Sequence, residues 1–196
     1  MPDAGRVIAG TARGRRLTAP GEGTRPLGDR VKQTLFAILG PDLPGATVLD
    51  LCAGSGAAGI EALSRGAARA TFVERDRRAA TTIAENLALT GLAGPNARIV
   101  RAEAVAWLTG SGAAEGLDAA FDLVFVDPPY ADTELLARLL EILGSPAETR
   151  LLAPRARVVA KHFWRDRPSA GVGLLASERD RRFGETGLTF YRREAR

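Results

Sequence analysis

A strand that is apolar on both faces constrains the fold of this chain more than any other feature. Residues Phe121–Val126, FDLVFV, are almost continuously apolar and contain β-branched and aromatic side chains. Strands of this kind are buried on both faces, which is typical of the centre of a parallel sheet covered by helices. The strand runs into Asp127, Pro128, Pro129 and Tyr130, and the prolines end the ladder because they have no N–H to donate. Asp127 therefore stands at a strand's carboxyl end, where open α/β sheets bind their ligands.

The four residues after this strand combine three chemically useful groups. They supply a carboxylate, a rigid turn with free carbonyls and a flat ring, which together could clamp a planar molecule that carries N–H groups. The alternative is a strand-ending turn in which Asp127 only caps the backbone. The residues of the turn alone do not decide between these readings.

Strands and helices alternate from Thr47 onward. The predicted strands are Thr47–Leu51, Ala70–Val73, Ala97–Val100, Phe121–Val126 and Arg157–Ala160. The predicted helices are Gly56–Arg65, Asp76–Thr90, Ala104–Leu108 and Asp132–Leu143. Two final strands, Val172–Ala176 and Thr186–Arg192, flank a polar turn and are expected to pair antiparallel. This order predicts an α/β, Rossmann-like fold with a mostly parallel seven-stranded sheet.

The first 40 residues are predicted to form an appendage to a main domain of residues 41–196. Arg6–Ala9 and Arg15–Thr18 read as a β-hairpin, Pro20–Gly28 as a linker, and Asp29 as the cap of a helix of about ten residues. The first 32 residues carry seven basic side chains against three acidic ones. Such a cluster is typical of a surface that binds phosphates, although a solvated arm rich in arginine fits equally well.

Composition excludes several classes of protein. Among 196 residues, Cys52 is the only cysteine and His162 the only histidine, so no disulfide framework or multi-histidine metal site is expected. No apolar run approaches the length of a membrane span, and the first residues lack the apolar centre of a signal peptide. A cytoplasmic protein is the expectation.

A glycine loop follows the first strand of the main domain. Residues 48–59 read VLDLCAGSGAAG, a G-x-G-x-x-G pattern between a strand and a helix. Asp50 would repel a pyrophosphate at the helix N-terminus but attract the cationic end of S-adenosylmethionine (SAM). Glu74 is placed to accept from ribose hydroxyls. Glu103 could accept from an adenine amino group, or it could be a carboxylate favoured by a helix dipole.

Five stretches of the chain are distinctive when taken together: RVIAGTARGRRL (6–17), TRPLGDRVKQTLF (24–36), LDLCAGSGAAGIEALSRGA (49–67), the DPPY segment and GETGLTFYRR (184–193). In these stretches the chain resembles the RsmD family, bacterial 16S rRNA guanine-N2 methyltransferases of the class I SAM-dependent fold. Three positions depart from the usual pattern. Ala12 stands where the family commonly has Trp, Leu27 replaces Thr, and Lys161 replaces an acidic residue.

The resemblance implies a SAM-dependent enzyme that methylates 16S rRNA within the 30S subunit, acting as a monomer without metal. The predicted catalytic residues are Asp127, Pro128, Pro129 and Tyr130. The predicted cofactor residues are Asp50, Ala53, Gly54, Ser55, Gly56, Glu74, Arg75, Glu103, Ala104 and Asp127. The predicted RNA contacts are Arg13, Arg15, Arg16, Arg25 and Arg30.

In the expected reaction, Asp127 and the Pro128 carbonyl each accept one N–H of an exocyclic amine, and Tyr130 stacks on the base. A carboxylate suits guanine, whose N1–H and N2–H donors are adjacent, but the same motif occurs in adenine-N6 methyltransferases. The target base must be unpaired or flipped out. Three alternatives remain: an adenine-N6 methyltransferase on DNA or RNA, an NAD-dependent oxidoreductase, and a non-catalytic RNA-binding module. Trp107 and Trp164 are expected to be packing residues.

Overall fold

The computed structural model describes residues 3–21, 27–110, 120–148 and 150–194. The chain divides into two compact units, Met1–Glu103 and Ala104–Arg196.

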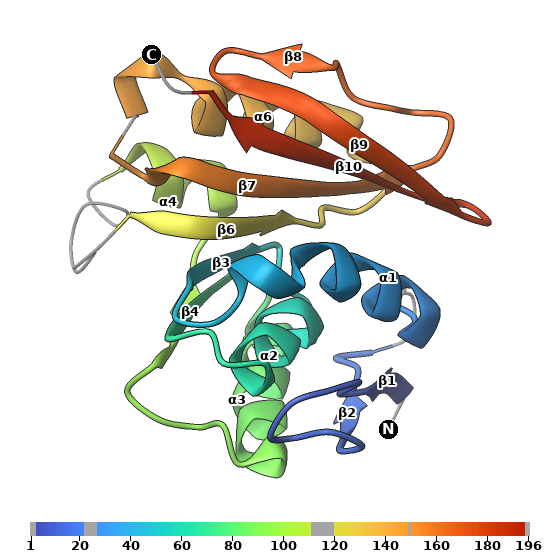
Figure 1. Ribbon diagram of the computed structural model, residues 1–196. Coiled ribbons are helices and arrows are strands. Elements are labelled where there is room, and N and C mark those ends of the chain that lie inside the picture. Colours follow the sequence, from blue (N-terminus) through green and yellow to red (C-terminus); the bar gives the residue numbers. More distant parts are fainter. Residues whose placement is uncertain (1–2, 22–26, 111–119, 149, 195–196) are drawn as a thin grey trace. The chain divides into compact units, whose positions relative to one another are not determined.

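The first unit contains three parallel strands and two helices of the predicted alternation (Figure 1). The strands are β3 (Thr47–Leu51), β4 (Arg69–Glu74) and β5 (Ala97–Arg101), in the spatial order β5-β4-β3. The helices are α2 (Ala57–Ser64) and α3 (Arg77–Thr90). Asp76 begins α3 by accepting from the Ala79 N–H at 2.8 Å, and Gly91 ends it with a left-handed φ of 72°. All five elements match the predictions to within two residues.

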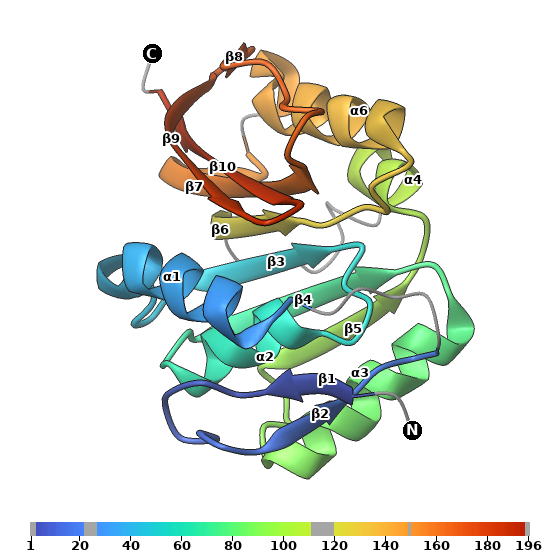
Figure 2. The ribbon, with the colours of Figure 1, turned by 90° about the vertical axis from the view of Figure 1, so that its right-hand side faces the viewer.

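The predicted N-terminal hairpin is confirmed, but its first strand begins three residues earlier. The remaining elements of this unit are β1 (Asp3–Arg6), β2 (Arg16–Thr18), α1 (Asp29–Leu39) and the 3-10 turn η1 (Gly40–Asp42). The hairpin lies beside α2 and α3 and does not extend the three-stranded group (Figure 2). Asp29 is not the helix cap, because Gly28 holds that position without a side-chain bond. The Asp29 carboxylate instead binds Arg6 at 3.0 Å and the fully buried Lys32 at 3.5 Å.

Two polar side chains of α2 attach the hairpin to the rest of the first unit. Glu61 is 1% exposed and accepts from the backbone N–H groups of Ile8 at 2.7 Å and Ala9 at 3.1 Å. Ser64 accepts from the Ala12 N–H at 2.9 Å and donates to the Ala9 carbonyl at 2.6 Å. Buried backbone groups need such partners, so these bonds fix the path of the arginine-bearing turn.

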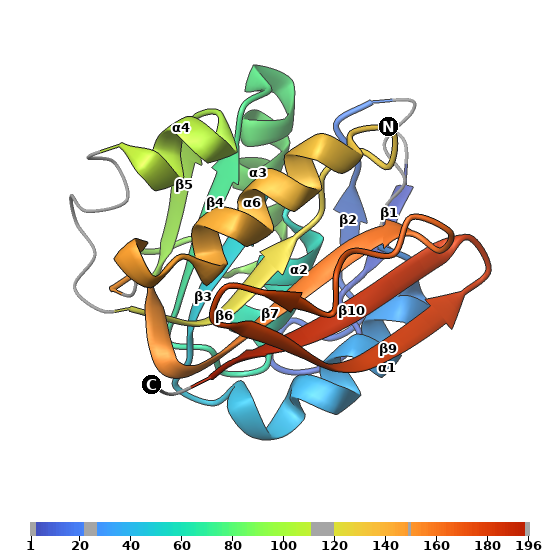
Figure 3. The ribbon, with the colours of Figure 1, turned by 90° about the horizontal axis from the view of Figure 1, so that it is seen from above.

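The second unit is built around five strands in the order β6-β7-β10-β9-β8. The strands are β6 (Phe121–Val126), β7 (Leu152–Phe163), β8 (Gly171–Val172), β9 (Leu175–Phe183) and β10 (Thr186–Arg193). The helices are α4 (Ala104–Thr109), α6 (Thr133–Gly144) and the 3-10 turn η2 (Pro146–Glu148). β6 and β7 are parallel, whereas every later pair is antiparallel. Figure 3 shows α6 crossing one face of these strands, and its buried residues include Leu136, Leu139 and Leu140.

The predicted fold class is confirmed, with corrections at the C-terminal strands. β7 has twelve residues instead of the predicted four. Pairing with β10 extends it to Phe163, and pairing of Leu152 with Phe121 of β6 extends it at its start. The predicted antiparallel pairing of the last two strands is confirmed for β9 and β10, but the strand predicted near Val172–Ala176 has the wrong bounds. Its place is taken by the two-residue β8 and by β9, which runs through the charged residues predicted to be a turn. The predicted seven strands correspond to β3, β4, β5, β6, β7, β9 and β10, with β8 as an addition.

Gly59 in α2 packs directly on Phe72 of β4, which leads to a stability prediction. A Cβ at Gly59 would lie 2.3 Å from the Phe72 ring, a distance that forces the helix or the ring to move. We expect Gly59→Ala to lower the free energy of unfolding by about 1–3 kcal/mol through overpacking. Urea denaturation measures this change. In the Phe72→Leu background the same substitution should cost less, and an equal cost in both backgrounds would contradict the overpacking explanation.

Candidate active site

Two buried carboxylates of the first unit hold the glycine loop in shape. Asp50, in β3, is 2% exposed and accepts from the Gly59 N–H at 2.9 Å. Glu74, at the end of β4, accepts from the Gly54 N–H through one oxygen and from the Asp76 N–H through the other, both at 2.9 Å. Each carboxylate oxygen has a second lone pair, so Glu74 keeps the capacity to accept from a ribose hydroxyl.

The glycines of the loop divide into two kinds. Gly54 has φ +56°, and a Cβ placed there would meet no atom within 4 Å, so the loop is open at this point. Gly56 has φ +75°, and its Cβ would lie 3.1 Å from Ile83 and 3.3 Å from Phe72. Gly54 therefore lets a ligand approach the backbone, whereas Gly56 allows the helix to pack closely. Half-exposed Cys52 has φ +58°, a conformation that is uncommon for a side-chain-bearing residue and recurs at binding sites.

The other predicted cofactor residues are distributed around this loop and beyond it. Ala53 and Ser55 are buried within the loop, whereas Arg75 follows Glu74 and is exposed. Glu103 is exposed and ends the first unit, and Ala104 is buried at the start of the second. The structure thus groups Asp50, the loop and Glu74.

Asn86 of α3, which the sequence analysis missed, connects the glycine loop to the hairpin. Its side chain is fully buried and donates to the carbonyls of Ser55 and Thr18, both at 2.9 Å. Its oxygen accepts from the Thr18 N–H, also at 2.9 Å. A polar residue on the inner face of an amphipathic helix was the only sequence signal.

The DPPY segment of the second unit contains an ion pair. The Lys161 ammonium, in β7, lies 2.7 Å and 2.9 Å from the two carboxylate oxygens of Asp127, which follows β6. The Lys161 side chain is 9% exposed, whereas that of Asp127 is 33% exposed. The carboxylate is therefore held in one orientation while it stays accessible. The sequence signal was Lys161 itself, the basic residue that departs from the family pattern.

The rest of the segment supports the predicted geometry. The Pro129 carbonyl accepts from the Asp132 N–H at 2.9 Å, whereas the Pro128 carbonyl has no hydrogen-bond donor among the described residues. Tyr130 is half-buried, and its hydroxyl lies 2.8 Å from that of Thr186 in β10. The Lys161 ammonium lies 5.1 Å from the centre of the Tyr130 ring, within the range of a cation–π contact. A carboxylate, a carbonyl without a hydrogen-bond donor among the described residues, and a fixed ring therefore come together within this unit.

His162, beside Lys161, is a packing residue and not a second catalytic group. It is 5% exposed, its Nδ1–H donates to the Phe163 carbonyl at 2.8 Å, and Nε2 lies 3.0 Å from the Thr189 hydroxyl. Burial lowers the pKa of His162, and the bond to the Phe163 carbonyl offsets this in part. Gly187 is required opposite the ring, since a Cβ there would lie 2.3 Å from it.

The depressed pKa of His162 predicts a dependence of stability on pH. Below the ordinary imidazole pKa of about 6.5, the unfolded chain takes up a proton that the folded chain resists. We expect the free energy of unfolding to fall as the pH is lowered from 7.5 to 5.5. Urea denaturation at both pH values should show a smaller fall for His162→Gln. An identical fall would assign the effect to other groups.

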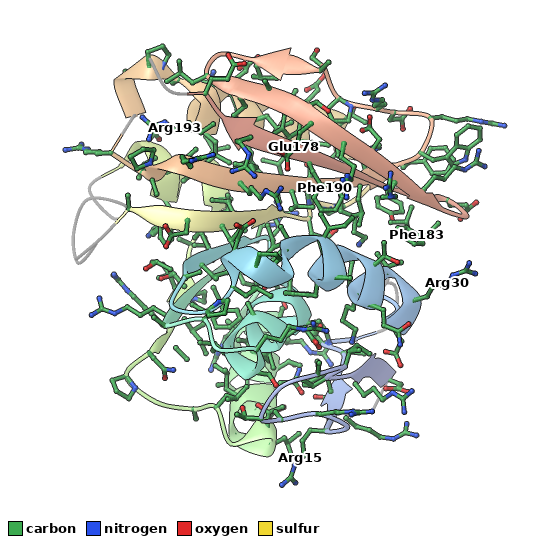
Figure 4. The ribbon with its side chains drawn as sticks, viewed as in Figure 1. Arg15, Arg30, Glu178, Phe183, Phe190 and Arg193 are labelled. Atoms are coloured by element: carbon green, nitrogen blue, oxygen red, sulfur yellow. The ribbon has the colours of Figure 1, made fainter. Side chains whose placement is uncertain are left out.

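The predicted RNA-binding arginines lie in the first unit. Arg13, Arg15 and Arg16 are exposed in the hairpin turn and the start of β2, and Arg16 pairs with Asp3 at 3.2 Å. Figure 4 shows Arg15 and Arg30 pointing away from the ribbon. Arg25 lies outside the described residues. The side chains of Arg13, Arg15, Arg16 and Arg30 are exposed, and contact of the predicted arginines with RNA stays a prediction.

Across the described residues, no group of three or more His, Cys, Asp or Glu side chains could hold a metal ion. None of the helices in the described ranges is long and apolar enough to cross a membrane.

Comparison with known proteins assigns the sequences of both units to one family. The family model described as Conserved hypothetical protein 95 matches residues 5–192. A putative rRNA methyltransferase of Bacillus subtilis (YlbH) is 38% identical over 96% of this chain and 98% of its own. Ribosomal RNA small subunit methyltransferase D of Escherichia coli is 42% identical over 78% of this chain and 75% of its own. The chain belongs to the RsmD family.

A solved member of the family has the same fold. A putative methyltransferase from Escherichia coli superimposes with a TM-score of 0.80 at 37% identity, covering 97% of this chain and 98% of its own. The same architecture occurs at 13% identity in a putative methyltransferase complexed with SAH, with a TM-score of 0.67 over 84% of this chain and 49% of the other. The second likeness shows the fold alone.

Proposed function

We propose that this protein transfers the methyl group of SAM to the exocyclic N2 amine of a guanine in 16S rRNA. The carboxylate of Asp127 carries the proposal, because Lys161 holds it in place while a third of its surface stays open. The family adds support, since relatives that align over most of this chain are named as rRNA methyltransferases. Action on ribosomal RNA fits a location in the cytoplasm. We further propose that the protein is a monomer and that it acts on the 30S particle.

The glycine loop of the first unit fits SAM better than a dinucleotide. Asp50 adds a buried negative charge beneath the loop, which disfavours a pyrophosphate at the α2 N-terminus. The open space at Gly54 and the free lone pairs of Glu74 suit an adenosine with ribose hydroxyls. When bound, SAM supplies an electrophilic methyl group on a sulfonium centre.

The residues of the second unit would present the amine. A base amine is a poor nucleophile because its lone pair is delocalised into the ring. Asp127 and the Pro128 carbonyl can each accept one N–H and so direct that lone pair, an effect of alignment that reaches about 7–11 kcal/mol in well-oriented reactions. Asp127 can also accept the proton that the methylated amine releases. Tyr130, fixed by Thr186, would stack on the base, a contact worth about 1–3 kcal/mol.

The Lys161 ammonium also favours a second candidate, adenine-N6 methylation. Guanine presents two donors to Asp127 and an acceptor, O6, that could face Lys161. Adenine presents one donor to Asp127 and the acceptor N1, which could receive a hydrogen bond from the same ammonium. The Lys161 ammonium as donor and the Asp127 carboxylate as acceptor could thus accommodate either base. Guanine is preferred because of the family.

Methylation of unmodified 16S RNA, both naked and assembled into 30S particles, tests the proposal. Nucleoside mass spectrometry should detect N2-methylguanosine after incubation with SAM. N6-methyladenosine would replace the proposal with the second candidate, and the absence of any methylated nucleoside would overturn both. Calorimetric titration with SAM and with NAD provides the cofactor control, since binding of NAD alone would indicate an oxidoreductase.

A further inference from the structure

A cluster of arginine and aromatic side chains lies at one end of β7 and at the β9–β10 turn. The guanidinium carbon of Arg182 lies 3.5 Å from the centre of the Trp164 ring, and that of Arg165 lies 4.8 Å from it. Phe163 continues the cluster, with its ring centre 6.3 Å from that of Trp164. We call Phe163, Trp164, Arg165 and Arg182 the Trp164 cluster.

The two arginines of the Trp164 cluster keep their charge available. Both are exposed, and neither forms an ion pair with a carboxylate within the described part of the chain. Other arginines of the same unit differ, because Arg157 and Arg192 share Glu178 at 2.7 Å and 3.0 Å. A cation–π contact orients a guanidinium without neutralising it, so the guanidinium keeps its positive charge for binding phosphate.

The Trp164 cluster is joined to the DPPY segment by fixed contacts. The rings of Tyr130 and Phe163 lie 6.4 Å apart. Thr186, which bonds the Tyr130 hydroxyl, pairs with Phe163 of β7 and with Phe183 of β9. Figure 4 places Phe183 close to the turn between β9 and β10.

Arg182 and Trp164 are themselves anchored to this turn. The Arg182 Nε–H donates to the Gly184 carbonyl at 3.0 Å, and the Trp164 N–H donates to the Glu185 carbonyl at 3.0 Å. Gly184 has φ +59°, which the tight turn requires. The position of the guanidinium is therefore set relative to Tyr130.

We propose that Arg165 and Arg182, held on Trp164, bind phosphates of the RNA strand next to the nucleotide that enters the DPPY site. The inference rests on the proposed function and assigns a strand-positioning surface to it. A base in that site must leave its stack, so contacts to the neighbouring phosphates are needed to keep the RNA backbone in position. Contacts of this kind set position without reading sequence.

Binding of a 16S rRNA transcript at several salt concentrations tests this surface. For Arg165→Ala/Arg182→Ala we expect affinity to fall by about tenfold or more. The slope of log affinity against log salt should decrease by about 1.4, because each single-strand phosphate contact contributes about 0.7. KM for RNA should rise with kcat unchanged. Arg138→Ala is the matched control, since this exposed arginine of α6 pairs with Glu141 at 3.3 Å and should change neither quantity.

A second variant separates charge from orientation. Trp164→Leu keeps both arginines but removes the ring that holds them, so we expect a loss of about threefold with an unchanged salt slope. A double-arginine variant with the wild-type slope and KM would overturn the inference, even if the wild type produces N2-methylguanosine. A wild type that binds the transcript but yields another nucleoside would overturn the proposed reaction, and the salt slopes would still decide the role of the Trp164 cluster.

Discussion

Asp127→Ala should abolish methyl transfer while leaving SAM binding nearly unchanged. The substitution removes the carboxylate that would orient the amine and receive its proton, and general acid–base groups of this kind contribute about 10²- to 10⁴-fold to rate. Lost alignment adds to that effect, so we expect kcat to fall at least about 10³-fold. Single-turnover methylation of 16S RNA and calorimetric titration with SAM measure the two quantities.

The alanine variant also leaves the nearly buried Lys161 ammonium without its carboxylate, which could destabilise the second unit. Asp127→Asn serves as the second variant, because its amide retains one acceptor oxygen and the side-chain volume. It should remain folded and lose most of the activity, since an amide cannot take up the proton. Loss of SAM binding in both variants would assign Asp127 to the cofactor site instead.

Lys161→Met should lower kcat by about 10- to 100-fold with little change in KM for SAM. Methionine fills the buried space of the lysine stem but cannot fix the two Asp127 oxygens or contact the Tyr130 ring. Because Asp127 is one-third exposed, water can solvate the carboxylate that is left, and the fold should persist. The kcat and KM values for SAM and RNA, with a thermal melt, measure these effects.

Two companion substitutions sharpen this test. Lys161→Arg keeps the charge and should retain more activity than Lys161→Met. Lys161→Glu restores the acidic residue usual in the family but places two carboxylates together, which should destabilise the protein at neutral pH and less so near pH 5. Full activity in Lys161→Met would show that the ion pair has no part in the reaction.

Local chemistry explains which elements could be predicted from sequence. β3 and β6 are mostly apolar runs, followed by the glycine loop and by Asp127 with two prolines, so hydrophobic patterning locates them. Helix α3 follows Asp76 and α6 follows Asp132, and both caps accept the expected backbone N–H. Long-range pairing decides the exceptions. β9 carries the charged sequence of residues 177–182, and its backbone becomes a strand because β10 offers a partner along its whole length.

The same distinction holds at the candidate site. Asp127 and Asp50 could be predicted as site residues because each lies at or near the end of a buried strand. A carboxylate is costly to bury there unless it is paired or binds a ligand. The ion-pair partner of Asp127 could not be predicted, because Lys161 lies 34 residues away and only the parallel pairing of β6 with β7 brings it near. Asn86 lies in no motif, and Thr186 lies in the GETGLTFYRR stretch without a predicted role, so the roles of both follow from tertiary contacts alone. The cap predicted at Asp29 failed because Arg6 and Lys32 engage the carboxylate instead.

The side chain of Asn86 joins two parts of the first unit, the glycine loop and the hairpin. The same amide group forms direct hydrogen bonds with Ser55 in the glycine loop and with Thr18 in the hairpin strand. A ligand that shifts the loop would therefore strain or move the end of β2 at Thr18, and a ligand that shifts β2 would act on the loop in the same way. Linkage makes such coupling reciprocal, so cofactor affinity and RNA affinity should each depend on whether the other ligand is present.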